Sequence, residues 1–189
     1  MPSNATATGP RVAGTVRPRD VSSLPRARPA RWTGCMTDQI SREDRRVAES
    51  DIARLVHTYC HRLDAGDFDA VAAMFEHATW QLSSEIVTTG SAEKTAVLQE
   101  AMMLHDGKPG TRHMVSNLVV DVAGDGQTAR SLSYVLTSQV APGFPLQLIS
   151  QARYEDTFSN RNGQWRFASR VVHSDGVGDM SHHQKGAAG

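Results

Sequence analysis

The sequence is poor in cysteine and has no long apolar run. Its 189 residues include two cysteines, Cys35 and Cys60, which offer neither a disulfide framework nor the spacing of a metal site. No segment approaches the roughly 18 to 20 apolar residues that cross a membrane. The N-terminus also lacks the apolar central region of a secretory signal. We therefore expect reduced thiols, a cytoplasmic location and no membrane partner.

A net charge is lacking too, but the balance is uneven along the chain. The formal net charge is +0, from 20 basic and 20 acidic residues. Residues 1–35 carry six arginines against one acid, Asp20, which leaves 14 basic and 19 acidic residues for the rest. Because phosphate binding needs a basic face, this acidic body argues against nucleic acid as a partner.

The two ends of the chain show no pattern that would form a core. Residues 1–38 are rich in Pro, Arg, Ala and Ser, so we expect a disordered tail. Met36 is a plausible natural start, which would make the preceding segment a translation-start artefact or a dispensable arm. Residues 177–189 are expected to be a flexible C-terminal tail, in which His182 and His183 form a solvated pair. The domain is expected over residues 39–176, long enough to bury a core.

Hydrophobic periodicity predicts helices in the first half of this domain. A helix is expected over residues 41–63, with Ser41 as N-cap and Gly66 in the left-handed position after its end. Its apolar face consists of Ile52, Leu55, Val56, Tyr59, Cys60 and Leu63. Asp67 is expected to cap a short helix over residues 68–75. Ser91 is expected to cap a third over residues 92–104, where Met103 lies in a soft apolar end suited to a pocket wall.

Strand patterns fill the remainder. Residues 78–90 indicate one strand or a hairpin, and further strands are expected over residues 111–122, 128–140, 146–158 and 164–173. A tight turn is expected at residues 160–163. This order predicts an α+β fold, a cone-shaped barrel in which a curved, mostly antiparallel sheet wraps around the N-terminal helices. Such a sheet leaves a hollow that suits a small ligand.

Candidate site residues lie at the start of the strand over residues 111–122. Alternation places His113, Val115 and Asn117 on one face, and an imidazole with an amide suits a pocket wall. Tyr59 and Asp64 can point into the same space from the end of the first helix. The structural alternatives are a histidine that hydrogen-bonds a loop and a solvated carboxylate at a helix end.

Four segments carry a family pattern in order along the chain. They are Tyr59-Cys-His-Arg-Leu-Asp64-Ala-Gly-Asp67, Phe75-Glu-His-Ala-Thr-Trp80, Arg112-His113-Met-Val-Ser-Asn117, and Tyr154-Glu-Asp-Thr-Phe158 with Gly163-Gln-Trp-Arg-Phe167. Together they resemble the SnoaL-like branch of the nuclear transport factor 2-like fold. The resemblance covers residues 51–175.

Within that family the motifs resemble those of scytalone dehydratase, hexachlorocyclohexane dehydrochlorinase and bile-acid dehydratase. The resemblance implies a dyad in which His113 takes a proton from carbon and Asp64 orients it, with Tyr59 matching a tyrosine of the bile-acid enzyme. It implies pocket roles for Trp80 and Arg170. Ser138 stands where the scytalone enzyme has a second pocket histidine, and Leu63 stands where it has a tyrosine, so scytalone itself fits poorly as the substrate.

The expected function is therefore that of a cofactor-independent lyase or isomerase, of dehydratase or cyclase type, acting on a small cyclic or polyketide-like molecule. Its substrate contacts are expected to be Trp80, Asn117, Arg170, Met103 and Ser138, with no metal and no cofactor. An imidazole paired with a carboxylate can exchange a proton near neutral pH. Two alternatives stay open: a non-catalytic binding module, and a structural subunit resembling the small subunit of ring-hydroxylating dioxygenases. By resemblance we expect a homo-oligomer, a dimer or trimer.

Overall fold

The computed structural model describes residues 39–82, 87–88 and 90–186. The predicted N-terminal tail and residues 83–86, 89 and 187–189 lie outside these ranges. The described elements are α1 (Arg42–Ala65), α2 (Phe68–Met74), β1 (Thr79–Gln81), β2 (Val87–Thr88), α3 (Ser91–Ala101), β3 (Thr111–Val122), β4 (Thr128–Ala141), β5 (Phe144–Arg161) and β6 (Gln164–Val177). None of the helices in these ranges is long and apolar enough to span a membrane.

Helix α1 has both predicted caps, and it ends at Ala65, two residues later than predicted. The Ser41 hydroxyl accepts a hydrogen bond from the backbone N–H of Asp44 at 3.0 Å. Gly66 follows the helix with a φ of 78°, a left-handed conformation in which glycine carries no Cβ penalty. One stripe of the helix is buried, made of Ala48, Ile52, Val56, Tyr59, Cys60, Leu63 and Asp64. The carboxylate of Asp64, in the last turn, therefore points toward the interior.

The two shorter helices pack together and against α1 through α2. Asp67 caps α2 as predicted, accepting a hydrogen bond from the N–H of Ala70 at 3.3 Å. The prediction for α3 is wrong at both ends. Ser91 is the first helical residue, after Gly90, which makes no side-chain cap bond. The helix ends at Ala101 because Met102 is extended, with φ −90° and ψ 138°.

The strands form one six-stranded sheet in the order β2-β1-β6-β5-β4-β3. Every neighbouring pair is antiparallel except β1 with β6. Residues 78–90 thus give a hairpin rather than one strand, and Ile86 of the predicted strand lies outside the described residues. Asn162 and Gly163, with φ of 54° and 82°, make the tight turn between β5 and β6.

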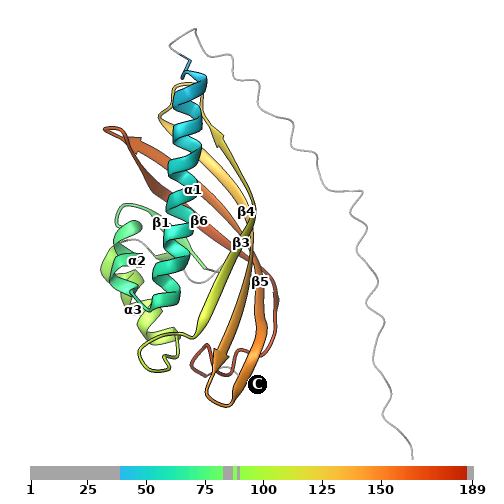
Figure 1. Ribbon diagram of the computed structural model, residues 1–189. Coiled ribbons are helices and arrows are strands. Elements are labelled where there is room, and N and C mark those ends of the chain that lie inside the picture. Colours follow the sequence, from blue (N-terminus) through green and yellow to red (C-terminus); the bar gives the residue numbers. More distant parts are fainter. Residues whose placement is uncertain (1–38, 83–86, 89, 187–189) are drawn as a thin grey trace, which may run out of the picture. The chain divides into compact units, whose positions relative to one another are not determined.

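The sheet curves around α1, which packs against β3 and β6 (Figure 1). Strand β4 shows how the core side is set, because alternate residues from Ala129 to Gln139 are buried. The core joins this inner face to the helices through residues such as Ile52, Val135 and Phe158. The predicted α+β class with a curved, mostly antiparallel sheet is confirmed. The packing of α1 on β3 brings the end of that helix against the start of that strand.

The segment after β6 lies against the end of α3. The N–H of Met103 donates to the carbonyl of His183 at 2.8 Å, and that of Lys185 donates to the carbonyl of Ala101 at 2.9 Å. The side-chain amide of Gln139 donates to the carbonyl of His182 at 2.9 Å. The sequence predicts a loose tail from residue 177. The described part of this segment is instead held by hydrogen bonds, which leave no apolar pattern in the sequence.

Candidate active site

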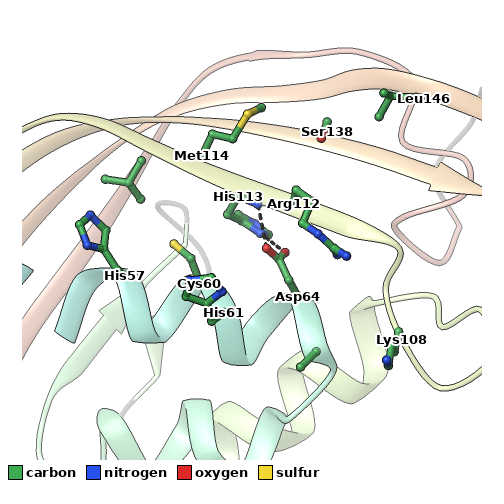
Figure 2. A pocket seen from close by; sticks show the side chains of 12 residues that line it. His57, Cys60, His61, Asp64, Lys108, Arg112, His113, Met114, Ser138 and Leu146 are labelled. Carbon is green, nitrogen blue, oxygen red and sulfur yellow. Dashed lines mark hydrogen bonds and ion pairs between the residues drawn. The ribbon is translucent and has the colours of Figure 1, made fainter. Parts of the chain in front are cut away.

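The side chains of Asp64 and His113 meet where the end of α1 faces the start of β3 (Figure 2). Nδ1 of His113 lies 2.6 Å from Oδ1 of Asp64. The backbone N–H of His113 donates to Oδ2 of Asp64 at 2.9 Å, and the Thr111 hydroxyl donates to Oδ1 at 2.7 Å. The two side chains are only 9% and 10% exposed. The structure therefore brings together the two residues that the sequence predicts as a dyad.

These contacts determine the protonation of the pair. Burial, the largest single influence, would raise the pKa of Asp64, but the hydrogen bonds and charge of His113 and the bond from Thr111 outweigh it and lower that pKa below its usual value. Asp64 is then a carboxylate at neutral pH and only accepts hydrogen bonds. The hydrogen of this bond must sit on Nδ1 of His113. In the neutral ring the free lone pair lies on Nε2.

His113 lines a mostly apolar cavity of about 210 Å³ between the helices and the sheet. Its walls include Tyr59 and Leu63 of α1, Trp80 of β1, Leu98 of α3, Val135 and Thr137 of β4, Tyr154 of β5, and Met180 and His183 of the C-terminal segment. An apolar cavity of roughly 150 Å³ can hold a benzene molecule. This one therefore has room for a small cyclic compound beside the dyad.

His113 also borders a larger, open groove of about 740 Å³ along β3, the edge strand of the sheet. Figure 2 shows the side chains around it, among them Lys108, Arg112 and His61. Ser138 lies in this groove and is not among the residues that line the cavity. Because the cavity brings Tyr59, Trp80 and His183 beside His113, we take the cavity as the candidate active site.

Comparison with known proteins identifies the family. The sequence model of the SnoaL-like domain matches residues 44–171, which is more than half of the chain. The chain belongs to the SnoaL-like family. No curated protein matches it.

Several solved structures share the fold of this SnoaL-like chain. A proposed scytalone dehydratase of Novosphingobium aromaticivorans has a TM-score of 0.62 at 22% identity, over 78% of this chain and 99% of that one. The protein Aln2 of a Streptomyces species has a TM-score of 0.58 at 23% identity, over 73% and 95%. A nuclear transport factor 2-like protein with a cystatin-like fold, also of Novosphingobium aromaticivorans, has a TM-score of 0.56 at 22% identity, over 71% and 84%. These likenesses show the fold.

Two further predicted residues of the SnoaL-like domain, Tyr59 and Trp80, lie in the cavity wall. Burial raises the pKa of Tyr59 to about 12, although the positive charge of Arg170 opposes the shift. Tyr59 therefore keeps its phenolic hydrogen at neutral pH. Trp80 is 1% exposed, and its Nε1 has no hydrogen-bond partner among the described residues. Both side chains can contact a bound molecule.

Arg170, in contrast, is a core residue rather than a substrate contact. It is absent from the cavity lining and 0% exposed. Its Nε and Nη2 both donate to the carboxylate of Asp156 at 2.7 Å. Its guanidinium carbon lies 4.2 Å from the ring centre of Tyr59 and 4.0 Å from that of Tyr154. The positive charge is thus stabilised by a buried carboxylate and by the faces of four aromatic rings, those of Tyr59, Tyr154, Phe75 and Phe167, and the guanidinium packs against the Tyr59 ring.

Asn117 and Met103 lie outside the cavity wall. The pairing of β3 with β4 shifts between Ser116 and Val119, and Asn117 sits in this bulge, exposed and with a φ of 52°. The bulge reverses the alternation, so the expectation that His113 and Asn117 share a face is wrong. Met102, rather than Met103, lines the cavity, because the chain leaves α3 at that point.

Two residues of the site were not predicted from the sequence. Thr111 donates to the dyad carboxylate, and a threonine two residues before His113 on a strand was the available signal, since alternate residues share a face. His183 reaches the cavity from the C-terminal segment. The sequence shows a pair of histidines there, but no periodicity that would place either one.

Proposed function

We propose that this SnoaL-like protein is a cofactor-independent lyase or isomerase, of dehydratase or cyclase type, acting on a small cyclic or polyketide-like molecule. The observation that carries the proposal is the 2.6 Å contact between His113 Nδ1 and Asp64 at the wall of a mostly apolar cavity. The shared fold of a proposed scytalone dehydratase supports the dehydratase class.

His113 is assigned as the base. Nε2 takes a proton from a carbon next to a carbonyl, and the electron pair of the broken C–H bond moves toward the carbonyl oxygen to form an enolate. Asp64 stabilises the resulting imidazolium and keeps the ring oriented. We assign the Tyr59 hydroxyl, which stays protonated and belongs to a residue of the cavity wall, as the donor of a hydrogen bond to the enolate oxygen.

Two outcomes follow from the enolate. In an elimination, its electron pair expels a leaving group from the β carbon, and the proton held by His113 leaves with that group as water when the group is a hydroxyl. In an isomerisation, His113 returns the same proton to a different carbon. Both sequences start and end with a neutral ring, so the enzyme needs no external acid.

The base can be tested without a native substrate. 5-Nitrobenzisoxazole opens to a coloured cyanophenolate when a base removes the proton on its ring carbon and the N–O bond breaks. We expect catalysis by the wild type, and a loss of roughly 10²–10⁴-fold in His113→Ala, the usual contribution of a positioned base. His77→Ala is the matched control, because His77 is 71% exposed and lies in neither the cavity nor the groove.

Two results would count against the proposal. A His113→Ala variant that opens the probe as fast as the wild type would remove His113 as the base. A wild type no faster than free imidazole at equal concentration would favour a binding module that uses the same cavity without turnover.

A further inference from the structure

The C-terminal segment forms part of the cavity. Met180, His183 and Gln184 line it, and the segment is fixed there by the backbone bond from Met103 to His183 and by the pairing of Met102 with Gln184. Because these bonds use main-chain atoms, they position the His183 ring without engaging it. The ring is therefore held against the cavity by its own backbone.

The ring of His183 has a different environment from the ring of its neighbour His182. The His182 ring stacks on Phe144, with ring centres 4.6 Å apart, and does not line the cavity. Nδ1 of His183 is shielded from solvent and has no hydrogen-bond partner among the described residues. Burying a polar atom without a partner is unfavourable, and the described residues supply no compensating hydrogen bond to this nitrogen.

The surroundings of His183 also separate its chemistry from that of His113. Burial, and the positive charge that His113 can hold, lower the pKa of His183 to about 4, against the opposing influence of Asp64. His183 is therefore neutral at pH 7. A neutral imidazole offers one donor and one acceptor, and it adds no positive charge that would oppose proton uptake by His113.

We propose that His183 is a second substrate contact, hydrogen-bonding an oxygen substituent of the bound molecule while His113 acts on a C–H bond of the same molecule. The reaction at His113 in this inference rests on the proposed function, whereas the hydrogen bond from His183 to the bound molecule does not. The inference narrows the substrate class to rings that carry a hydroxyl or a second carbonyl group in addition to the carbonyl next to the acidic C–H. A plain hydrocarbon ring would leave His183 without a partner.

Binding of p-nitrophenol, a ring with a hydroxyl group, tests the inference. Its absorption quenches tryptophan fluorescence, and Trp80 lies in the cavity wall. At pH 5.5, where this probe is mostly the neutral phenol and His183 is neutral, we expect His183→Ala to bind about tenfold more weakly, a single hydrogen bond's contribution. His182→Ala should bind within about twofold of the wild type, since its ring lies outside the cavity. His183→Gln, which keeps a donor and an acceptor, should fall in between.

A second measurement covers the case in which the variants are unstable. In wild-type protein with ¹⁵N-labelled histidine, p-nitrophenol should shift the ring nitrogens of His183 and leave those of His182 in place. Equal affinity of His183→Ala and wild type, no shift at His183, or no binding to the wild type would each overturn the inference. If one of these results is obtained while 5-nitrobenzisoxazole still opens in a His113-dependent way, the proposed function stands and only the His183 contact is wrong. If His183 binds p-nitrophenol as expected but the opening does not depend on His113, the contact stands and the proposed function is wrong.

Discussion

The Asp64 carboxylate accepts hydrogen bonds from two parts of one residue, the ring Nδ1 of His113 at 2.6 Å and its backbone N–H at 2.9 Å. The second bond does not depend on the side chain. With the Thr111 hydroxyl, it leaves Asp64 two donors when the ring is removed. We therefore expect His113→Ala to fold, so that its loss of activity reports on the ring itself.

Thr111→Val should weaken the dyad without removing it. The substitution keeps the shape of the side chain but deletes the hydroxyl that donates to Asp64 at 2.7 Å. Hydrogen bonds to charged groups are worth about 1.5–3 kcal/mol, so we expect a loss of that order in the free energy of unfolding. The rate with 5-nitrobenzisoxazole should fall less than in Asp64→Asn. Urea unfolding and initial rates measure the two effects.

Thr88→Val is the matched control for that variant. Thr88 is also buried, at 2% exposure, but its hydroxyl donates to an uncharged acceptor, the carbonyl of Trp80, at 3.3 Å. A smaller loss of stability, about 1 kcal/mol, and an unchanged rate are expected. Equal effects of the two substitutions would mean that the Thr111 hydroxyl does nothing particular for Asp64.

Arg170→Met should act on stability. The variant leaves the carboxylate of Asp156, which is 0% exposed, without its partner, and breaking a buried ion pair in this way costs about 3–5 kcal/mol. The double variant Arg170→Met with Asp156→Leu should recover most of that loss, because no charge is then buried. Arg153→Met, which removes a surface partner of Asp175, should change the unfolding midpoint little. A double variant no more stable than Arg170→Met would contradict this account.

Acid should destabilise the protein in two separate ranges. His183 has a pKa near 4 when folded, against 6.5 for the ordinary side chain, so the unfolded chain binds more protons between these values. The free energy of unfolding should therefore fall as the pH drops from 6.5 to 4, by at most about 3 kcal/mol from this group. The pKa of Asp64 is lowered from 3.8, so its contribution is lost only below that pH.

Urea unfolding from pH 4 to 7 checks the assignment of the upper range. His183→Ala should show a shallower pH dependence than the wild type, whereas His182→Ala should keep the wild-type slope. The charged and titratable groups that act on His183 are His113 and Asp64, and both are present in both variants. Identical slopes for the wild type and His183→Ala would show that the ring is not held neutral by burial.

Asn117→Val tests the bulge. Asn117 has a φ of 52°, and left-handed backbone costs an L-residue with a Cβ roughly 1–2 kcal/mol, with Asn among the exceptions. We expect Asn117→Val to be less stable by about that amount, and Asn117→Gly to be as stable as the wild type. Both should open 5-nitrobenzisoxazole at the wild-type rate. A strong loss of rate in both variants would place Asn117 at the substrate after all.

The fold could be predicted from local patterns because each element carries its own. The buried stripe and the two caps of α1 follow from residues that are close together in the sequence. Strand β3 spans residues 111–122 as expected. The bulge in β3 was not visible, because one additional residue in a strand changes the direction of every side chain beyond it without changing the composition. That single shift accounts for the wrong placement of Asn117.

The partner of Arg170 depends on a similar shift. The turn at Asn162 and Gly163 sets a register that, continued unbroken, would pair Arg170 with Glu155. A shift between Thr157 and Phe158 pairs it with Asp156 instead. The position of His183 depends on main-chain bonds to residues some 80 positions earlier, which leave no periodic pattern. The dyad itself was predicted through family resemblance. Its contact with Thr111 was predicted neither from that resemblance nor from the residue pattern.

The central claim is that His113 and Asp64 act as one unit in removing a proton from carbon. A double-mutant cycle on the opening of 5-nitrobenzisoxazole tests it most directly. Residues that act as a unit give non-additive effects, so the double variant His113→Ala with Asp64→Asn should be no slower than His113→Ala alone. If the two losses multiply, or if Asp64→Asn keeps the full rate while His113→Ala does not, then Asp64 does not act through His113 and the dyad is not the catalytic unit.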